Sequence, residues 1–340
     1  MPKNIEDTCK DIEKYFYLHK PIKKKIFFTI LKSLLIFFKL YNYTNPETRS
    51  KIFRLIYIYF REIDDIIDGD KILNITSTDF NEYKKIVTEY MYNRYAFLQN
   101  GYSSSTPNEL DEIMKEILEL ANQLNLDLKN EFIKLLDCML FDLDRKCDLK
   151  NGQIKLKFKN DIDKYYFQYY CDSCIKIAIM LTIPEYVNQE CKDIRNLGYA
   201  QRIYFNLEDF FEDLSFGIIN ISKEDIENFE ISEQSLISIA KLPNRIINLC
   251  KKRGFNSLEV SKFIDEPIMC WLEQQLDLGI RYLRTYQKSA KLRTISSIGY
   301  ELLLQRYDFS DVILRLGIER GTNSYLSILE RQKVKKSFIL

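Results

Sequence analysis

Hydrophobic positions recur along this chain every three or four residues over long stretches, which is the period of an amphipathic helix. Residues 110–126 show this pattern most simply, and Pro or Gly stands at many places where the pattern stops. Helices are therefore predicted over residues 11–41 with a break near Pro21, and then over 49–68, 79–98, 110–126, 127–146, 161–183, 189–214, 232–252, 257–289 and 291–307. One short β-like run is predicted at residues 154–158.

The ends of some predicted helices carry recognisable signals. In Asn45-Pro46-Glu47-Thr48 a proline takes the first helical position, where its missing N–H leaves no hydrogen bond unmade. The helix that follows is predicted to end near Gly69, and a later helix to stop at Pro184. No repeat, low-complexity linker or change of composition divides the chain. The pattern therefore predicts one all-α domain over residues 1–340.

The composition fits long helices around a large core. Of the 340 residues 46% are hydrophobic and 14% aromatic, and only ten are Gly and seven Pro. So few turn-forming residues indicate brief connections between helices. The 50 basic and 49 acidic side chains give a net charge of +1, so a nucleic-acid-binding surface is not expected.

The eight cysteines are irregularly spaced, and Met1 to Lys10 is polar rather than basic and then apolar. Reduced thiols and a cytoplasmic location are therefore expected. Cys171 and Cys174 form a C-x-x-C pair, but no second pair stands at zinc-ligand spacing, and His19 is the only histidine. Two small core residues on a helix are the favoured interpretation of this pair.

Residues 26–40 come nearest to a membrane span, but Lys32 and Lys39 interrupt them. They fall short of the ~18 uninterrupted apolar residues that a membrane-spanning helix needs. A core or pocket helix is expected here. The alternative is a helix that lies on a membrane surface, which would give the protein a peripheral membrane contact.

An acidic cluster stands at the end of the helix predicted over residues 49–68. Asp64 and Asp68 are one turn apart on the same face, with Asp65 beside them. Arg61 lies three residues before Asp64, near that face. Carboxylates set among isoleucines and aromatic residues are unfavourable unless they are paired or bound to a cation. Hard oxygen ligands on one helix suit Mg²⁺, which takes one or two carboxylates together with water and substrate phosphates.

A second acidic cluster falls in the helix predicted over residues 189–214. Asp209 and Asp213 are again four residues apart, Glu212 is close by, and phenylalanines are frequent around them. We infer that the helices carrying the two clusters face each other across a hydrocarbon-lined pocket. Metal ions held by the clusters would bind a diphosphate there. Taken alone, either cluster is equally well explained as a solvated helix face with ordinary salt bridges.

Residues 57–68, Tyr-Ile-Tyr-Phe-Arg-Glu-Ile-Asp-Asp-Ile-Ile-Asp, resemble the first signature of the squalene/phytoene synthase family. Residues 197–213 are similar to its second signature, and Gly217 stands where that family has a glycine after the motif. Smaller related pieces are Asp142-Leu143-Asp144, Tyr170-Cys171-Asp172, and Tyr300 with the four residues after it. The resemblance covers residues 37–307 and keeps the pieces in order.

This resemblance implies an isoprenoid synthase-like helical bundle with a central hydrophobic cavity, in which prenyl diphosphates bind through Mg²⁺ or alternatively Mn²⁺. The family joins two such molecules head to head through a cyclopropylcarbinyl diphosphate, and NADPH is needed only where the product is reduced. The implied metal ligands are the paired aspartates and the acids beside them: Asp64, Asp65, Asp68, Asp209, Glu212 and Asp213. The implied contacts to diphosphate or to a developing cation are Arg61, Tyr57, Tyr170 and Tyr300.

The second signature departs from the family pattern. Arg202 and Phe205 stand where the family has Gln and Asn. Gln201 and Asn206 are each displaced by one residue from those positions. A shift of one residue turns a helical side chain by about 100°, so we expect Asn206 to reach a metal ion only at an angle.

Positive charge is also redistributed relative to the family. Glu208 stands where the family has arginine, which removes a positive group from a diphosphate site. Lys176 falls near a run of small residues in the family. We hypothesise that Lys176 and Arg202 restore the lost charge. The residues expected to contact substrate are then Arg61, Lys176, Arg202, Phe205 and Asn206.

Three functions agree with these features. The favoured one is head-to-head condensation of two farnesyl or geranylgeranyl diphosphates to a squalene-like or phytoene-like polyprene, with release of diphosphate. The second is a class I terpene synthase, which ionises and cyclises one prenyl diphosphate, and the altered second signature favours it. The third is a non-catalytic scaffold of the same fold. The retention of all four paired aspartates argues against a scaffold, because a buried acid pair without a ligand only lowers stability.

Overall fold

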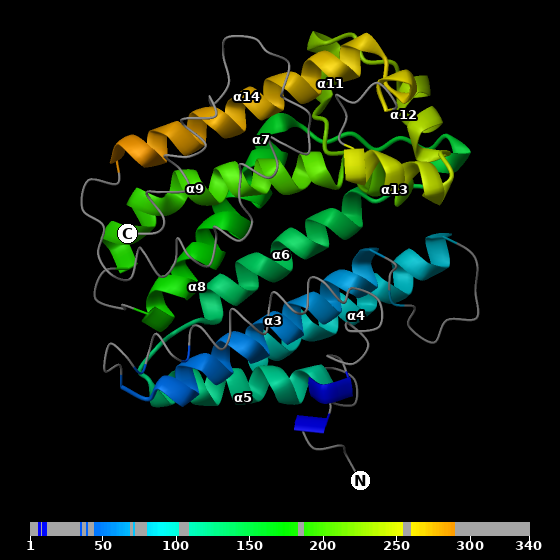
Figure 1. Cartoon of the computed structure of the whole chain (residues 1–340). Helices are drawn as coiled ribbons and strands as arrows, with labels where there is room; N and C mark the ends of the chain where they lie inside the picture. The colour runs from blue at the N-terminus through cyan, green and yellow to red at the C-terminus, as the bar shows by residue number, and fades with distance from the viewer. Residues whose placement is uncertain are drawn as a thin grey trace. The chain divides into compact units, whose positions relative to one another are not determined.

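The computed structural model describes residues 6–7, 9–11, 35, 39, 44–68, 71, 80–101, 109–182, 187–253 and 260–289 (Figure 1). All regular secondary structure in this part of the chain is helical, as the sequence predicts. No helix among these residues is both long enough and apolar enough to cross a membrane. Tyr300, the helix predicted at 291–307 and nearly all of the helix predicted at 11–41 lie outside the described residues.

The helices follow one another along the chain, some with no more than a few residues between them. They are α3 (Pro46–Asp68), α4 (Phe80–Asn100), α5 (Glu109–Gln123), α6 (Lys129–Arg145), α7 (Lys159–Asp163), α8 (Asp172–Thr182), α9 (Val187–Glu208), α10 (Phe210–Ser215), α11 (Lys223–Asn228), α12 (Glu233–Ala240), α13 (Asn244–Arg253) and α14 (Glu266–Ser289). A π-helix, Lys164–Cys171, joins α7 to α8, and short 3₁₀ turns lie at Leu149–Asn151 and Ser261–Phe263.

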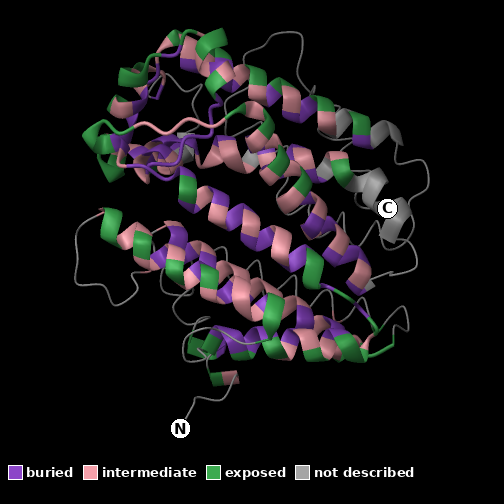
Figure 2. Ribbon diagram, turned by 180° about the vertical axis from the view of Figure 1, so that it is seen from behind, coloured by how far each residue is buried: buried purple, intermediate pink, exposed green. Residues whose placement is uncertain are grey.

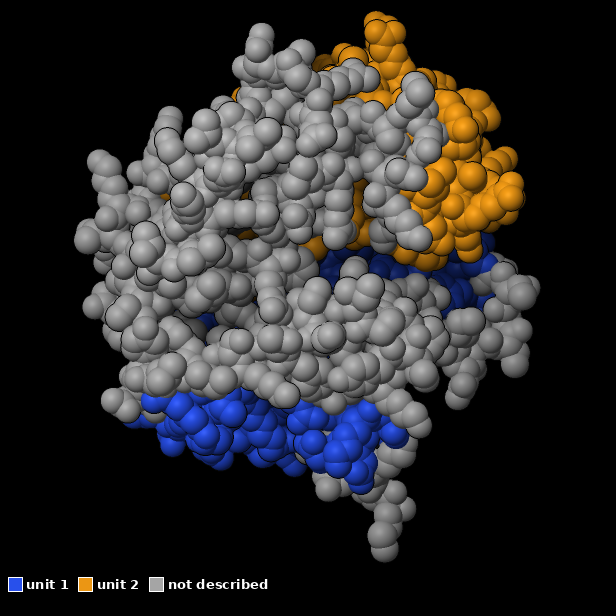
Figure 3. Space-filling view, viewed as in Figure 1, with its two compact units in different colours: residues 1–143, 176–188 blue, residues 144–175, 189–340 orange. Residues whose placement is uncertain are grey.

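The chain falls into two compact units that alternate along the sequence (Figure 3). The first unit contains residues 1–143 and 176–188, and the second contains residues 144–175 and 189–340. The unit boundaries cut α6, α8 and α9. The single domain expected from the sequence stays a prediction.

Several predicted helix boundaries are confirmed. α3 begins at Pro46 and ends at Asp68, and Asn45 before it has a positive φ of 54°. α4, α5 and α6 lie where the pattern placed them. The long aromatic helix predicted from residue 161 is also present, but its middle is π-helical. Such π-helical turns are rare and occur mostly inside α-helices, often at functional sites.

Four predictions of local structure are wrong. The helix predicted over 257–289 begins only at Glu266, after a short 3₁₀ turn at Ser261–Phe263. Residues 154–158 form no strand, because in the described part of the chain no strand pairs with them. The helix predicted over 189–214 is interrupted at Asp209. The helix predicted over 232–252 is divided into α12 and α13 by Pro243, which cannot donate a helical hydrogen bond.

In the first unit, α3 packs against α5, and both helices carry buried residues along their length (Figure 2). Ile52, Leu55 and Ile63 of α3 are buried, as are Ile113 and Ile117 of α5. These side chains recur at helical spacing, so each helix buries one face, and the exposed residues of α5 lie on its other face. The helix that carries the first acidic cluster is therefore anchored along most of its length.

A buried ion pair joins α4 to α5 beside this stripe. Arg94 Nε lies 3.0 Å from Asp111 Oδ1, and both side chains are at most 2% exposed. The Arg94 guanidinium also lies 4.8 Å from the centre of the Tyr90 ring. Removing one partner of such a pair leaves a buried charge, so the pair fixes how α4 and α5 meet.

In the second unit, α14 covers α10 and α11. Leu272 and Leu276 are buried, and the Trp271 ring lies 5.9 Å from that of Phe210 in α10. Trp271 Nε1 donates to Asp225 Oδ2 of α11 at 3.1 Å. α10 also contacts α12 and α13. The short helix that carries part of the second acidic cluster is thus held from several sides.

Candidate active site

The first acidic cluster lies on the last two turns of α3. Arg61 Nη1 donates to Asp64 Oδ2 at 2.6 Å, and Nη2 forms an ion pair with Asp65. The Asp65 side chain is only 6% exposed, whereas that of Asp64 is 42% exposed. One arginine therefore neutralises an enclosed carboxylate and an accessible one at the same time.

The other predicted residues of this cluster lie close to Arg61. Burial lowers the pKa of the Arg61 guanidinium. The electrostatic effect of nearby groups outweighs burial and raises that pKa above its usual range. These groups are Asp64, Asp65, Tyr57 and Asp68. The structure thus brings together all five residues that the sequence singled out on this helix.

Two further residues support this end of α3. The Tyr83 hydroxyl of α4 donates to the carbonyl oxygen of Ile66, and burial together with nearby Asp68 raises the pKa of Tyr83 to about 12. Lys71 forms an ion pair with the buried Glu62. Sequence reasoning missed both residues. For Lys71 a weak signal existed, since cations are favoured near the C-terminus of a helix.

Lys176 also lies in the first unit, where its Nζ forms an ion pair with Glu131 Oε1 at 2.6 Å. Glu131 is buried, and Lys134 Nζ lies 3.2 Å from its other oxygen. Two lysines around one carboxylate give a local excess of positive charge. This arrangement agrees with an anion-binding role for Lys176, which stays a prediction.

The second acidic cluster sits where the helix is interrupted. Asp209 has φ −93° and ψ 4°, outside the helical region, so α9 ends before it and α10 begins after it. The helical hydrogen bonds nevertheless continue: Asp209 N–H donates to Phe205 O at 2.9 Å, and Asp213 N–H donates to Asp209 O at 2.7 Å. The two aspartates keep their one-turn separation, and Glu212 lies half-buried in the first turn of α10.

An asparagine after α10 contacts the last acid of this cluster. Asn220 Nδ2 donates to Asp213 Oδ2 at 2.5 Å. Asn220 Oδ1 accepts from Arg145 Nη2 at 2.7 Å and from the Tyr166 hydroxyl at 3.0 Å. Sequence reasoning missed this group, because its members stand far apart along the chain.

Gly217 makes the turn that brings this asparagine back toward α10. Its φ is +81°, and a Cβ built there would lie 1.8 Å from Cys147 O. Cys147 N–H in turn donates to Gly217 O at 3.0 Å. Only glycine fits, because both the backbone conformation and the space exclude a side chain. The glycine noted in the family resemblance therefore has a structural cause in this chain.

Arg202 and Tyr170, both predicted site residues, lie together. The Arg202 guanidinium carbon is 3.8 Å from the centre of the Tyr166 ring and 5.1 Å from that of Tyr170. Both tyrosines stand on the π-helix. A guanidinium over aromatic faces is stabilised by the ring electrons. Tyr170, implied to lie near a developing cation, thus meets a cation that the chain itself supplies.

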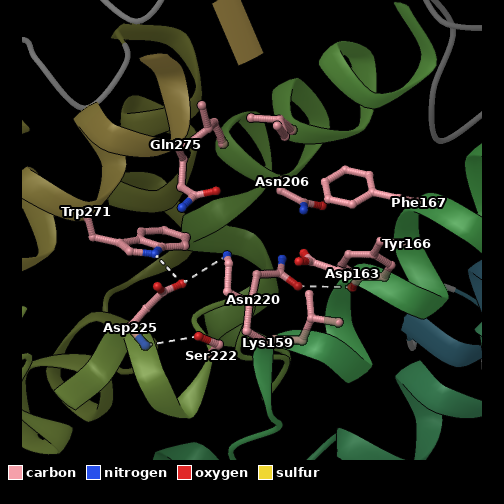
Figure 4. Close-up of a pocket in the computed structure, with 13 residues that line it drawn as sticks. Lys159, Asp163, Tyr166, Phe167, Asn206, Asn220, Ser222, Asp225, Trp271 and Gln275 are labelled. Atoms are coloured by element: carbon pink, nitrogen blue, oxygen red, sulfur yellow. Dashed lines mark hydrogen bonds and ion pairs between the residues drawn. The ribbon is translucent and has the colours of Figure 1, made fainter. Parts of the chain in front are cut away.

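A small cavity in the second unit contains Asn206 in its lining (Figure 4). Its volume is about 30 Å³, and the other polar residues around it include Asp163, Asn220 and Asp225. It has room for about two water molecules and is too small for a prenyl chain. The hydrophobic cavity implied by the family resemblance is a different feature and stays a prediction.

The donor set of the two clusters fits a hard cation. Among the described residues, no three Asp, Glu, His or Cys side chains lie close enough together to hold a metal ion unaided. Mg²⁺ needs fewer, since it is commonly held by one or two carboxylates and completed by water and substrate phosphates. Each unit offers such a carboxylate pair, Asp64 with Asp68 and Asp209 with Asp213.

Comparison with known proteins supports the fold. No family model and no curated protein matches this sequence. Among solved structures, a dehydrosqualene synthase in complex with a ligand aligns with 99% of this chain and 98% of its own, with a TM-score of 0.56 and 14% sequence identity. At that identity the likeness shows the fold alone. The chain therefore has an all-α, isoprenoid synthase-like fold.

Proposed function

We propose that this protein is a Mg²⁺-dependent synthase that joins two farnesyl or geranylgeranyl diphosphates head to head. The observation that carries the proposal is the likeness of fold to a dehydrosqualene synthase over 99% of the chain. Two aspartate pairs at one-turn spacing support it, as does the cluster of Tyr57 and the acids around Arg61.

In the first step, the bond from C1 of one prenyl diphosphate to its bridging oxygen breaks, and the electron pair leaves with the diphosphate. Bound Mg²⁺ would supply the positive charge that stabilises this leaving group. Arg61 would donate N–H groups to diphosphate oxygens, and Lys176 would add charge. The residues proposed to hold the metal ions are Asp64, Asp68, Asp209 and Asp213.

The allylic cation that remains must be kept from water and stabilised without a strong nucleophile. Aromatic faces meet both needs, and Tyr57 and Tyr170 are the proposed contacts. The double bond next to C1 of the second substrate then attacks the cation. Loss of one proton to the released diphosphate closes the cyclopropane ring and leaves a cyclopropylcarbinyl diphosphate.

The test is incubation of the full chain with Mg²⁺ and each prenyl diphosphate, with and without NADPH, followed by extraction and mass spectrometry. A product with a doubled carbon skeleton would support the proposal. Asp64→Asn and Asp209→Asn should abolish it. Asp277→Asn, an exposed substitution on α14, is the matched control and should leave it unchanged.

A class I terpene synthase is the second candidate, and one observation favours it. Phe205 offers no ligand oxygen from its side chain, and Asn206 lines the small cavity of the second unit. A second cluster changed in this way suits ionisation of a single substrate. The same assay separates the candidates, because a product with an undoubled skeleton would indicate this reaction. The absence of both a product and released pyrophosphate would indicate a non-catalytic scaffold.

A further inference from the structure

We propose that Asn220 is a positioning residue that holds the Asp213 carboxylate in place for the metal ion of the second acidic cluster. The inference rests on the proposed function, because it gives Asn220 a part in the same metal site. Its basis is the hydrogen bond of 2.5 Å from Asn220 Nδ2 to Asp213 Oδ2, the shortest side-chain contact of this group.

The orientation of the Asn220 amide follows from its neighbours. Arginine has only N–H donors, so the amide atom 2.7 Å from Arg145 Nη2 must be the oxygen. The amide nitrogen therefore faces Asp213. The Tyr166 hydroxyl, 3.0 Å from the same oxygen, donates a second hydrogen bond to it (Figure 4). Two donors on the oxygen side prevent the amide from rotating by half a turn.

Burial makes this arrangement rigid. Arg145, Tyr166 and Asn220 are 1%, 2% and 8% exposed. The Arg145 guanidinium also donates to Ile219 O at 2.8 Å and lies 5.0 Å from the centre of the Tyr166 ring. A side chain fixed at both ends by buried partners has little freedom to turn. Asn220 is thus tied to the α6 and π-helix segments of the second unit on one side and to Asp213 on the other.

The consequence concerns the metal-binding geometry. Partners that orient a metal ligand typically change metal affinity by about 10–100-fold when they are removed. With Asn220 in place, the plane of the Asp213 carboxylate is set before any metal ion binds. Without it, the carboxylate gains rotational freedom that metal binding must then remove.

The test measures binding of Mn²⁺ in the presence of inorganic pyrophosphate. Binding is detected as a loss of the free Mn²⁺ signal in electron paramagnetic resonance. Asn220→Ala should weaken Mn²⁺ binding by about 10–100-fold. Asn151→Ala is the matched control, because it removes a 2.7 Å hydrogen bond from an asparagine amide to Asp148 at an exposed site. This control should bind Mn²⁺ like the wild type.

A second variant guards against misfolding. Tyr166→Phe keeps the ring under Arg202 and removes one donor to Asn220, so a smaller loss of Mn²⁺ affinity is expected than for Asn220→Ala. Thermal unfolding of each variant shows whether it is folded. Wild-type affinity in a folded Asn220→Ala protein would overturn the inference, and so would wild-type affinity in Tyr166→Phe where Asn220→Ala does not fold.

Asp213→Asn separates this inference from the proposed function. If Asp213→Asn loses Mn²⁺ affinity and Asn220→Ala does not, only the role of Asn220 fails. If Asp213→Asn binds as the wild type does, or the wild type binds no Mn²⁺, the metal site itself fails and the inference fails with it.

Discussion

The two acidic clusters share a spacing but are held in different ways. On α3, Arg61 neutralises Asp64 and Asp65 from within the same helix, at the positions three and four residues away. At α10, Asp213 is contacted by Asn220 from the segment after the helix, and Arg145 stands behind the amide. The first cluster is organised locally, and the second is organised by residues distant in sequence.

This difference shows which part of a site a sequence can reveal. An arginine three or four residues from an acid predicts an ion pair on any helix. An asparagine seven residues after an acid predicts nothing until the intervening turn is known. The second cluster therefore depends on the fold around it, and changes there should affect both stability and metal binding.

Gly217→Ala should have the largest effect, because it disrupts the turn behind the second cluster. The added Cβ would meet a backbone atom, Cys147 O, at 1.8 Å, so a loss of stability on the order of 4 kcal/mol is expected. Gly152→Ala is the control: its φ is +86° but no atom lies within 4 Å of the new Cβ. It should lose only about 1 kcal/mol. Urea unfolding measures both, and equal losses would show that the contact with Cys147 is unimportant.

Arg61→Gln tests the local organisation of the first cluster. It leaves the carboxylate of Asp65, 6% exposed, without its cation, and we expect a loss of about 2–4 kcal/mol. Arg54→Gln on the same helix breaks an ion pair to Glu6, which is 44% exposed, and should lose at most about 1 kcal/mol. Chemical denaturation compares the two. A similar small loss in both would mean that the cluster does not need Arg61.

Arg202→Lys tests how much the contact of Arg202 with two tyrosine rings stabilises the unit that carries the second cluster. Lysine keeps the charge but loses the planar contact with Tyr166 and Tyr170, so a loss of about 1 kcal/mol is expected. Arg281→Lys, at an exposed position on α14, should change stability little. Thermal unfolding provides the measurement, and an unchanged midpoint for Arg202→Lys would show that stacking contributes nothing.

Asp163→Asn should have the smallest effect, and it depends on pH. Burial raises the pKa of Asp163, Lys159 lowers it, and Asp225 and Glu224 raise it, with a net increase. The folded state then holds this proton more tightly than the unfolded state. The resulting stability is fully present below the ordinary carboxyl pKa and is lost as pH rises through the raised value.

A neutral asparagine side chain at this position escapes that loss. Asp163→Asn should therefore raise the unfolding midpoint at pH 7 by on the order of 2 °C and give no advantage near pH 3. Thermal unfolding across this pH range tests the claim. A gain of the same size at both pH values would point to a cause other than ionisation.

The sequence predicted much of the fold and one half of the candidate site. α3 with Arg61 and its acids could be predicted, because helix start, apolar period and ion pairs all act over a few neighbouring residues. The interruption at Asp209 could not, since α10 is held by the contact of its Phe210 with Trp271 and by its contacts with α12 and α13. The π-helix was likewise missed, because its eight residues are too few to show a period different from that of the α-helices on either side.

By itself, then, the sequence determined an all-helical chain with two aspartate pairs, since both features depend on spacing within one or two turns. Only the tertiary structure decided which groups surround those carboxylates. Asp65 is enclosed by Arg61, Asp213 is held by Asn220, and Arg202 lies on two tyrosine rings. The last two depend on the turn at Gly217 and on contacts of Arg145 and Tyr166 with residues far along the chain, which periodicity does not encode.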